Sequence, residues 1–252
     1  MSRRFEELDH CDTSLGELIL RRRRYTGMDT DVYEVKLGDY FLMSSLFTAS
    51  EEALGRLGIQ YARNDRSVAA GSGTDDGRLD VVVGGLGLGY TAAAVLESPL
   101  VCSLLVVEYL DPVIEWHRRG LLPTSAILTG DGRCRLVSAD FFACAASRGG
   151  FDPERPGRRF DVILVDIDHS PDAWLDPTNE SFYQVPGLRG VKKHLLPGGV
   201  LGLWSNEPPD GAFQDRMDAV FAAQWVEPVR FHNPLQDVEA SQTVYIGLNS
   251  AG

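Results

Sequence analysis

The stretch Leu79-Asp-Val-Val-Val-Gly-Gly-Leu-Gly-Leu-Gly-Tyr-Thr-Ala-Ala-Ala-Val-Leu-Glu97 decides the fold of this chain. Its apolar start predicts a strand, Leu79–Val83, that is buried on both faces of a parallel sheet. The Ala-rich segment Tyr90–Leu96 predicts the helix that comes next. A G-x-G-x-G turn joins the two and consists of Gly85, Gly87 and Gly89. Glycines let the backbone turn sharply and bring main-chain N–H groups close to a ligand at the positive end of a helix.

The next predicted strand, Val101–Glu108, ends in an acid. Glu108 follows Gly85 by 23 residues, which is where nucleotide-binding folds place a carboxylate on the ribose hydroxyls. A glycine pattern alone is a weak signal, and a tight turn with a surface glutamate is the alternative. The strand, the turn, the helix and the acid occur together, so the sequence favours a nucleoside site.

Length and charge bound the class of protein. The 252 residues, 44% of them hydrophobic, fit one large α/β domain with a small extension. A net charge of −12 argues against a general nucleic-acid or anionic-membrane binder, because such an acidic surface repels polyanions. It is compatible with a cationic substrate such as a polyamine.

Cysteine spacing and the absence of long apolar runs bear on the compartment. The four cysteines show no C-x-x-C spacing, and Cys102 and Cys144 lie in apolar segments typical of a core. No 18-residue apolar span occurs, and the charged segment Met1–His10 lacks the apolar region of a signal peptide. We therefore expect a cytoplasmic protein.

The N-terminal part is expected to be a small extension. Residues 1–30 are polar and are predicted to be irregular apart from Leu15–Leu20. The basic run Arg21–Arg24 is either a phosphate or partner contact or, as we favour, a solvated flank that forms ion pairs. Alternation in Asp31–Leu37 and Tyr40–Met43 predicts a β-hairpin.

A helix and a connector complete this extension. Ser50 is a plausible N-cap of the helix, with acids in its first turn. The segment Arg63–Arg78, rich in Asn, Asp, Ser and Gly, predicts a flexible connector. We place an N-terminal extension at residues 1–78 and a catalytic domain at residues 79–252.

From Leu79 onward, predicted strands and helices alternate, which favours a Rossmann-like α/β fold with a seven-stranded sheet. The predicted strands are Leu79–Val83, Val101–Glu108, Arg135–Ser138, Phe160–Asp166, Val200–Trp204, Val226–Phe231 and Thr243–Leu248, the last two as an antiparallel pair. The predicted helices are Tyr90–Leu96, Pro112–Arg119, Asp140–Ser147, Pro186–Leu195 and Ala212–Ala223.

Polar residues come after the strands, where such folds bind their ligands. Asp140 could accept a hydrogen bond from an adenine amine, cap the next helix, or do both. Asp166 and Asp168 lie at the end of the fourth strand at positions that share a face, so their repulsion requires a cation; the alternative is two loop-capping carboxylates. His169 beside them is either a base or a solvated loop residue. The polar run Trp204–Pro208 after the fifth strand is predicted to line an acceptor pocket.

Several other chemistries are not indicated. No H-x-x-x-H, Cys/His cluster or EF-hand spacing predicts a metal site. No G-x-S-x-G elbow or Walker lysine predicts a hydrolase or a P-loop protein.

Five motifs in this order resemble the spermidine synthase family, and in particular short bacterial spermidine-synthase-like proteins with the S-adenosylmethionine (SAM)-dependent methyltransferase fold. They are Val-Gly-Gly-Leu-Gly-Leu-Gly, Val-Val-Glu-Tyr-Leu-Asp, Ser-Ala-Asp-Phe-Phe, Phe-Asp-Val-Ile-Leu-Val-Asp and Leu-Leu-Pro-Gly-Gly-Val-Leu. The resemblance covers about residues 31–250 and is weakest at its start.

The resemblance implies roles for individual residues. The glycines would cradle the amino-acid or aminopropyl arm of the donor, Glu108 would hold the ribose and Asp140 the adenine, and Asp166 would be the catalytic aspartate. The cofactor-binding set expected on this basis is Gly85, Leu86, Gly87, Gly89, Glu108, Tyr109, Asp140 and Phe141. The expected catalytic set is Asp166, Asp168 and His169.

Two departures from the family pattern bear on the reaction. Gly87 stands where aminopropyltransferases carry an Asp that pairs with the donor amine. Asp166-Ile-Asp-His-Ser-Pro171 replaces the family's D-x-x-D-P-x-G-P run, so the second acid is shifted or lost.

We therefore expect a SAM-dependent transferase that moves a methyl group to a small nucleophilic acceptor. The alternatives are aminopropyl transfer from decarboxylated SAM to a diamine, and a non-catalytic nucleoside-binding module. The loop His169–Glu180 is a candidate lid, and a homodimer is a possible assembly.

Overall fold

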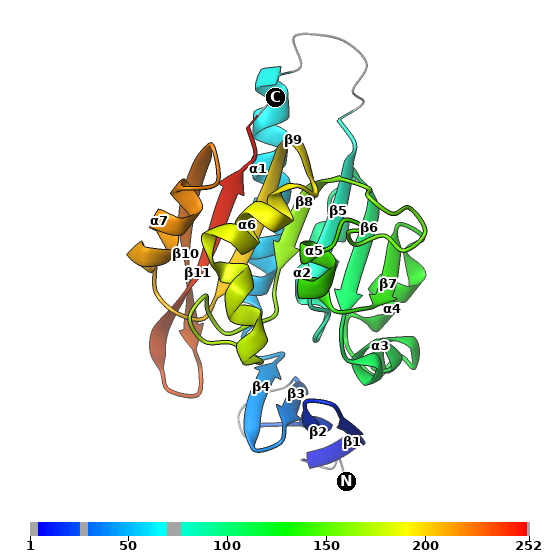
Figure 1. Cartoon of the computed structure of the whole chain (residues 1–252). Helices are drawn as coiled ribbons and strands as arrows, with labels where there is room; N and C mark the ends of the chain where they lie inside the picture. Colours follow the sequence, from blue (N-terminus) through cyan, green and yellow to red (C-terminus); the bar gives the residue numbers. More distant parts are fainter. Residues whose placement is uncertain (1–4, 26–29, 70–76, 251–252) are drawn as a thin grey trace.

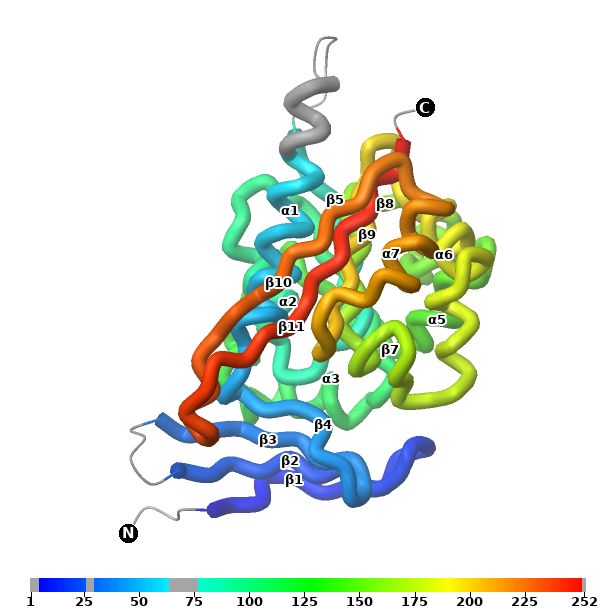
Figure 2. The backbone as a smooth tube through the Cα atoms, turned by 90° about the vertical axis from the view of Figure 1, so that its left-hand side faces the viewer, coloured from blue at the N-terminus to red at the C-terminus, as the bar shows by residue number. Residues whose placement is uncertain are grey.

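The computed structural model describes residues 5–25, 30–69 and 77–250. Two sheets form the molecule, one of four antiparallel strands in the order β1-β2-β3-β4 and one of seven strands in the order β10-β11-β9-β8-β5-β6-β7 (Figure 1). The small sheet lies at one end of the large one, beside the ends of its central strands (Figures 1 and 2).

The large sheet confirms the predicted α/β fold. Five neighbouring strands run parallel, and β11 is antiparallel to both β9 and β10. The strands are β5 (Leu79–Gly84), β6 (Val101–Glu108), β7 (Cys134–Ser138), β8 (Phe160–Val165), β9 (Leu195–Ser205), β10 (Ala223–Asn233) and β11 (Val238–Leu248).

Helices cover both faces of this sheet. One face carries α1 (Ala49–Ala69), α2 (Tyr90–Leu96), α3 (Asp111–Arg118) and α4 (Ser125–Gly130). The other carries α5 (Phe141–Ala146), α6 (Val185–Lys192), α7 (Gly211–Asp218) and a 3-10 helix, Pro177–Tyr183. The sequence did not predict α4 or the 3-10 helix, because six- and seven-residue elements show too little periodicity.

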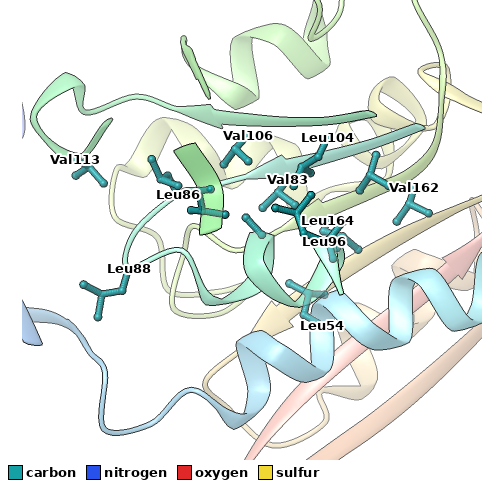
Figure 3. Close-up of a cluster of buried hydrophobic side chains, with 14 of the residues drawn as sticks. Leu54, Val83, Leu86, Leu88, Leu96, Leu104, Val106, Val113, Val162 and Leu164 are labelled. Carbon is teal, nitrogen blue, oxygen red and sulfur yellow. The ribbon is translucent and has the colours of Figure 1, made fainter. Parts of the chain in front are cut away.

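The central strand divides its side chains between two cores, as expected for a strand that is buried on both faces. Val81 and Val83 pack toward α1 and α2 in the cluster that Figure 3 shows. Val82 points to the opposite face, into the cluster beneath α5 and α6. The apolar start of the opening stretch thus fixes β5 in the centre of the domain.

The N-terminal region corrects one prediction. Residues 5–23 are not irregular, because β1 (Phe5–Thr13) and β2 (Gly16–Arg23) form a hairpin, and β2 pairs with β3 (Val32–Leu37), which pairs with β4 (Tyr40–Ser44). Residues 1–4 and 26–29 lie outside the described residues. Leu18 and Leu20 are buried on one face of this sheet. The basic run at its end forms ion pairs, including Arg21–Glu34 at 2.6 Å and Arg24–Asp31 at 2.6 Å. These pairs agree with the ion-pair interpretation of the run.

Helix α1 differs from its prediction at both ends. It begins at Ala49, so Ser50 lies inside the first turn and is not the N-cap. It continues to Ala69 through half of the predicted connector, and residues 70–76 of that connector lie outside the described residues. The helix packs beside β8, β9 and β11, so it covers the large sheet although the predicted boundary assigns it to the extension (Figure 2).

Two acid contacts fasten the small sheet to the large domain. Asp9 of β1 accepts hydrogen bonds from the Trp116 indole at 2.7 Å and from Arg119 at 2.9 Å.

The four cysteines are free thiols. Among the described residues, no helix is long and apolar enough to cross a membrane.

Candidate functional site

A pocket opens at the carboxyl ends of β5 to β8, where the strand order of the sheet reverses on either side of β5. Ligands of open α/β sheets bind at such reversal points. Three walls enclose it: the glycine loop, the small sheet, and the segment after β8. Its lining residues are Leu15, Leu42, Met43, Gly85, Gly87, Val107, Glu108, Tyr109, Leu110, Val113, Asp140, Phe141, Phe142, Asp166, Ile167, Leu175, Asp176, Thr178 and Asn179.

The glycine loop requires glycine at two positions that line the pocket. Gly85 has φ +89°, and a Cβ there would lie 2.0 Å from the carbonyl oxygen of Asp166. Gly87 has φ +46°, and a Cβ there would lie 2.9 Å from the Met43 sulfur. The first contact brings the ends of β5 and β8 together, and the second brings the loop against the small sheet.

Two side chains that the sequence did not single out hold this loop. The Nε2 of His117 lies 2.9 Å from the carbonyl oxygen of Gly87, and the Thr124 hydroxyl donates to the carbonyl of Leu88 at 2.5 Å. Burial lowers the pKa of His117, so the imidazole is neutral and donates from Nε2. Gly89 packs against Thr124 and His117, which explains the third glycine of the motif. Both side chains come from later helices, so no local pattern could have identified them.

Glu108 lies at the end of β6 as predicted and is buried there. Its two carboxylate oxygens accept hydrogen bonds from the backbone N–H groups of Leu86 at 2.9 Å and of Leu110 at 2.8 Å. Burial raises the pKa of Glu108, while these N–H groups act in the opposite direction. The backbone N–H groups of Gly87 and Tyr109 also act on this carboxylate, and the residue lines the pocket. The Leu86 side chain belongs to the core, so its part in the site is its backbone N–H.

Three more of the predicted cofactor-binding residues line the same pocket. Asp140 caps α5 through Oδ1, which accepts from Phe142 N at 2.8 Å and Ala143 N at 3.0 Å, and the residue also lines the pocket. The ring of Phe141 is buried beneath Gly84, where a Cβ would lie 2.4 Å from it. Tyr109 is half exposed and receives a hydrogen bond from Ser14 of the small sheet at 3.4 Å.

Asp166 lies at the inner end of the pocket and pairs with an acid that the sequence analysis missed. The Thr91 hydroxyl lies 2.6 Å from Oδ2 of Asp166. Glu51 in the first turn of α1 is its electrostatic neighbour. Burial raises the pKa of both carboxyls, and the charge on Asp166 raises that of Glu51 further. The two residues are 115 positions apart, since 166 − 51 = 115, so no sequence spacing could have linked them.

The hydroxyl of Thr91 supports a proton on this pair. It lies within hydrogen-bond distance of two acceptors, Asp166 Oδ2 at 2.6 Å and the carbonyl oxygen of Glu51 at 3.1 Å. One hydroxyl has one proton to donate. If Asp166 carries a proton and donates it to Thr91, the hydroxyl can donate to Glu51 and both contacts are satisfied. The two contacts of Thr91 and the raised pKa of Asp166 therefore act in the same direction, toward a proton on Asp166.

The structure does not place Asp168 and His169 in this pocket. Strand β8 ends at Val165, so the face-sharing rule for a continuing strand no longer holds at 166 and 168. Asp168 is buried and accepts from Leu175 N at 2.7 Å, from the Asn179 amide at 3.0 Å and from the Tyr183 hydroxyl at 2.8 Å. His169 uses its carbonyl oxygen to bind Asn206 N at 2.7 Å. The predicted acid pair is thus replaced by Asp166 and Glu51.

The polar run after the fifth strand lies next to this acid pair. The Trp204 indole donates to the Ser50 hydroxyl at 2.9 Å, and Ser50 lies 2.9 Å from Glu51 Oε2. Gln242 of β11 contacts the same hydroxyl and donates to Asn206 at 2.7 Å. A polar cluster therefore adjoins Asp166, and its other members do not line the pocket. We refer to Glu51, Asp166, Ser50, Trp204 and Gln242 as the acceptor cluster.

Known structures share this architecture. A spermidine synthase from Thermotoga maritima aligns with a TM-score of 0.68 at 15% identity, over 98% of this chain and 74% of that chain. A spermidine synthase in complex with the transition-state analogue AdoDATO aligns with a TM-score of 0.68 at 15% identity, over 98% of this chain and 73% of that chain. Human methyltransferase-like protein 13 in complex with SAH aligns with a TM-score of 0.53 at 21% identity, over 80% of this chain and 82% of that chain. No protein-family model matches the sequence.

These similarities confirm the predicted fold. The chain has a Rossmann-like seven-stranded sheet of the SAM-dependent methyltransferase type, preceded by a small antiparallel sheet. At 15–21% identity the likeness concerns the fold and not the reaction.

Proposed function

We propose that this protein is a SAM-dependent transferase that moves a methyl group to a small, cationic or hydroxylated acceptor. The observation that carries the proposal is the meeting of Glu108, the glycine loop and Asp166 around one pocket. A carboxylate for ribose hydroxyls and a carboxylate for an acceptor lie on either side of the same turn. The ligands named with two of the similar structures, AdoDATO and SAH, belong to the same adenosyl class as the proposed donor.

The pocket residues fit an adenosyl donor. Gly85 and Gly87 bring bare backbone to the pocket wall, Glu108 lines the same pocket, and Asp140 has its Oδ2 beyond the capping bonds. Apolar side chains such as Val107, Leu110 and Ile167 supply surface for a planar base. When bound, SAM would supply an electrophilic carbon beside its sulfonium, so the protein's task is alignment and exclusion of water.

The acceptor cluster would orient the nucleophile. Asp166 lines the donor pocket and also contacts Thr91, so it joins the two parts of the site. A carboxyl whose pKa is raised by burial accepts a proton better than an ordinary aspartate does. In the reaction, the acceptor's lone pair would bond to the transferred carbon as the bond from that carbon to sulfur breaks. The acceptor's proton would pass to the carboxyl pair.

The absence of a side chain at Gly87 favours SAM over decarboxylated SAM as the donor. SAM has a carboxylate that an acid in the loop would repel, and position 87 carries no side chain. The neighbouring group is the Met43 thioether, which is neutral. The second candidate, aminopropyl transfer, is favoured by the Glu51–Asp166 pair, which suits a cationic amine, and by the likeness to spermidine synthases.

Product formation from SAM labelled on its methyl group tests the proposal. The protein is incubated with labelled SAM or decarboxylated SAM and a panel of amines and alcohols, and products are identified by mass. We expect a methylated product from SAM. We expect Asp166→Asn to lower kcat by about 10²-fold or more with donor affinity within about two-fold, because the group acts on the acceptor. Aminopropylated product alone would establish the second candidate, and no product with no donor binding would refute both.

A further inference from the structure

The segment after β8 returns over the donor pocket and forms one of its walls. Leu175, Asp176, Thr178 and Asn179 line the pocket, although they come after the end of the strand by ten residues or more. Asp176 caps the 3-10 helix by accepting from Thr178 N at 2.8 Å. We call residues 174–180 the covering segment. Its distance from the donor depends on what fastens it to the domain.

Asp168 is that fastening point. Its Oδ1 accepts from the backbone N–H of Leu175 at 2.7 Å, and the Asn179 amide bonds both oxygens at 3.0 and 3.2 Å. From the opposite side, the Tyr183 hydroxyl donates to Oδ2 at 2.8 Å. Asp168 is 2% exposed, so these bonds form away from water. Two of these three partners are themselves pocket-lining residues.

We propose that Asp168 is a positioning residue that holds the covering segment at the distance at which it contacts the adenosyl donor. The inference rests on the proposed function, because it assumes that the pocket binds such a donor. Asp168 does not line the pocket, so its effect on the donor passes through Leu175 and Asn179. This role differs from that of Asp166, which lines the pocket and belongs to the acceptor cluster.

The chemistry of the site requires a carboxylate. Each of these partners of Asp168 is a donor: a backbone N–H, an amide NH₂ and a phenol. A carboxylate only accepts, so it satisfies all three at once. An asparagine would turn its own NH₂ toward the Asn179 amide in either orientation, and also toward Leu175 N in place of Oδ1 or toward the Tyr183 hydroxyl in place of Oδ2. The variant Asp168→Asn thus keeps the side-chain size and removes part of the fastening.

Calorimetric titration with S-adenosylhomocysteine tests the role. We expect Asp168→Asn to weaken binding by about ten-fold, which equals about 1.4 kcal/mol. In turnover with the donor varied, KM for the donor should rise by a similar factor while kcat at saturating donor stays within about two-fold. A purely structural role would instead reduce the amount of folded protein and leave both constants per folded molecule unchanged.

Tyr183→Phe is the matched control. It removes one hydrogen bond from the same carboxylate, but from the buried side and from a residue that does not line the pocket. We expect it to lower the unfolding temperature while S-adenosylhomocysteine affinity stays within about two-fold. An equal loss of affinity in both variants would show that general loosening is responsible and would overturn the proposal.

Hydrogen exchange on the unmodified protein gives a second readout if Asp168→Asn fails to fold. The Leu175 amide, which donates to Asp168, should be protected and should become more protected when S-adenosylhomocysteine binds. An unprotected Leu175 amide in both states would overturn the inference. Failure of the unmodified protein to bind S-adenosylhomocysteine at all would refute the proposed function, which is a separate outcome.

Discussion

At the scale of single residues, the proposed acceptor chemistry rests on Glu51 and Asp166. Burial and the charge on Asp166 raise the pKa of Glu51 from 4.5 to about 8. An acid with a raised pKa in the folded state keeps its proton when the unfolded chain has lost it. Between about pH 4.5 and pH 8 the folded state therefore binds more protons, and the free energy of unfolding falls as the pH rises.

Glu51→Gln should remove this dependence. We expect the variant's unfolding temperature, relative to the unmodified protein, to rise from pH 5 to pH 8.5, because the amide has no charge to bury. Thermal unfolding at several pH values measures the difference. Glu52→Gln is the control, since Glu52 pairs with Arg56 near the surface at 3.0 Å. A pH-independent difference for Glu51→Gln would contradict the raised pKa of Glu51.

Gly87 and Met43 are the residues that bear on donor choice. Gly87→Asp places a carboxylate beside the donor and requires the flexible end of Met43 to move, because a Cβ at 87 would lie 2.9 Å from its sulfur. We expect Gly87→Asp to weaken SAM binding more than decarboxylated SAM binding. The double variant with Met43→Ala should bind both more tightly than Gly87→Asp alone, because the crowding is relieved.

Titration of both donors against the variants measures these effects. Gly87→Ala separates strain from charge: it shares the positive φ and the Met43 contact but has no carboxylate. A selectivity change of the same size in Gly87→Ala would mean that charge at position 87 is not the cause.

At the scale of elements, the small sheet acts as a wall of the donor pocket, through Leu15, Leu42 and Met43. Asp9 holds the sheet to α3 by accepting from the buried Trp116 indole. Asp9→Ala should lower the free energy of unfolding by about 1–3 kcal/mol, because it leaves that donor unpaired, and should weaken S-adenosylhomocysteine binding several-fold. Urea unfolding and calorimetry measure the two effects.

Arg119→Ala is the control for this prediction, since it removes a more exposed partner of the same acid. We expect it to change stability by less than about 1 kcal/mol. A destabilised Asp9→Ala protein with unchanged S-adenosylhomocysteine affinity would mean that the sheet does not contribute to donor binding.

The same elements separate the features that the sequence could predict from those that it could not. The strands β5 and β6 and the positions of Gly85 and Glu108 were predictable, because a buried strand, its turn and its final acid are local patterns. The hairpin of β1 and β2 was missed, because β1 is mostly polar and because Ile19 interrupts the alternation of Leu18 and Leu20 in β2. The end of a strand also controls where the next residues point, and the early end of β8 separated Asp168 from Asp166.

In the candidate site too, features set by local sequence could be predicted, and those set by distant contacts could not. Asp140 could be assigned as a cap from its position before a helix, and it is one. Glu51, His117 and Thr124 act through contacts with segments distant in sequence, so only tertiary structure could bring them to the site.

At the scale of the whole molecule, a net charge of −12 should attract cationic acceptors. We expect kcat/KM for a cationic acceptor to fall as the salt concentration rises from about 0.01 M to 0.15 M, because the Debye length shortens from about 30 to about 8 Å. A neutral hydroxylated acceptor should show a much smaller change. Initial rates at several ionic strengths measure this, and identical salt dependence for both acceptors would contradict steering by charge.

The central claim is that the pocket at the ends of β5 to β8 binds SAM as the donor. Side-by-side calorimetric titration of the unmodified protein with SAM and with decarboxylated SAM tests it most directly. We expect SAM to bind more tightly, because Gly87 leaves its carboxylate unopposed by an acid in the loop. A clear preference for decarboxylated SAM would contradict the methyltransferase proposal and support aminopropyl transfer, and binding of neither would contradict the assignment of the pocket itself.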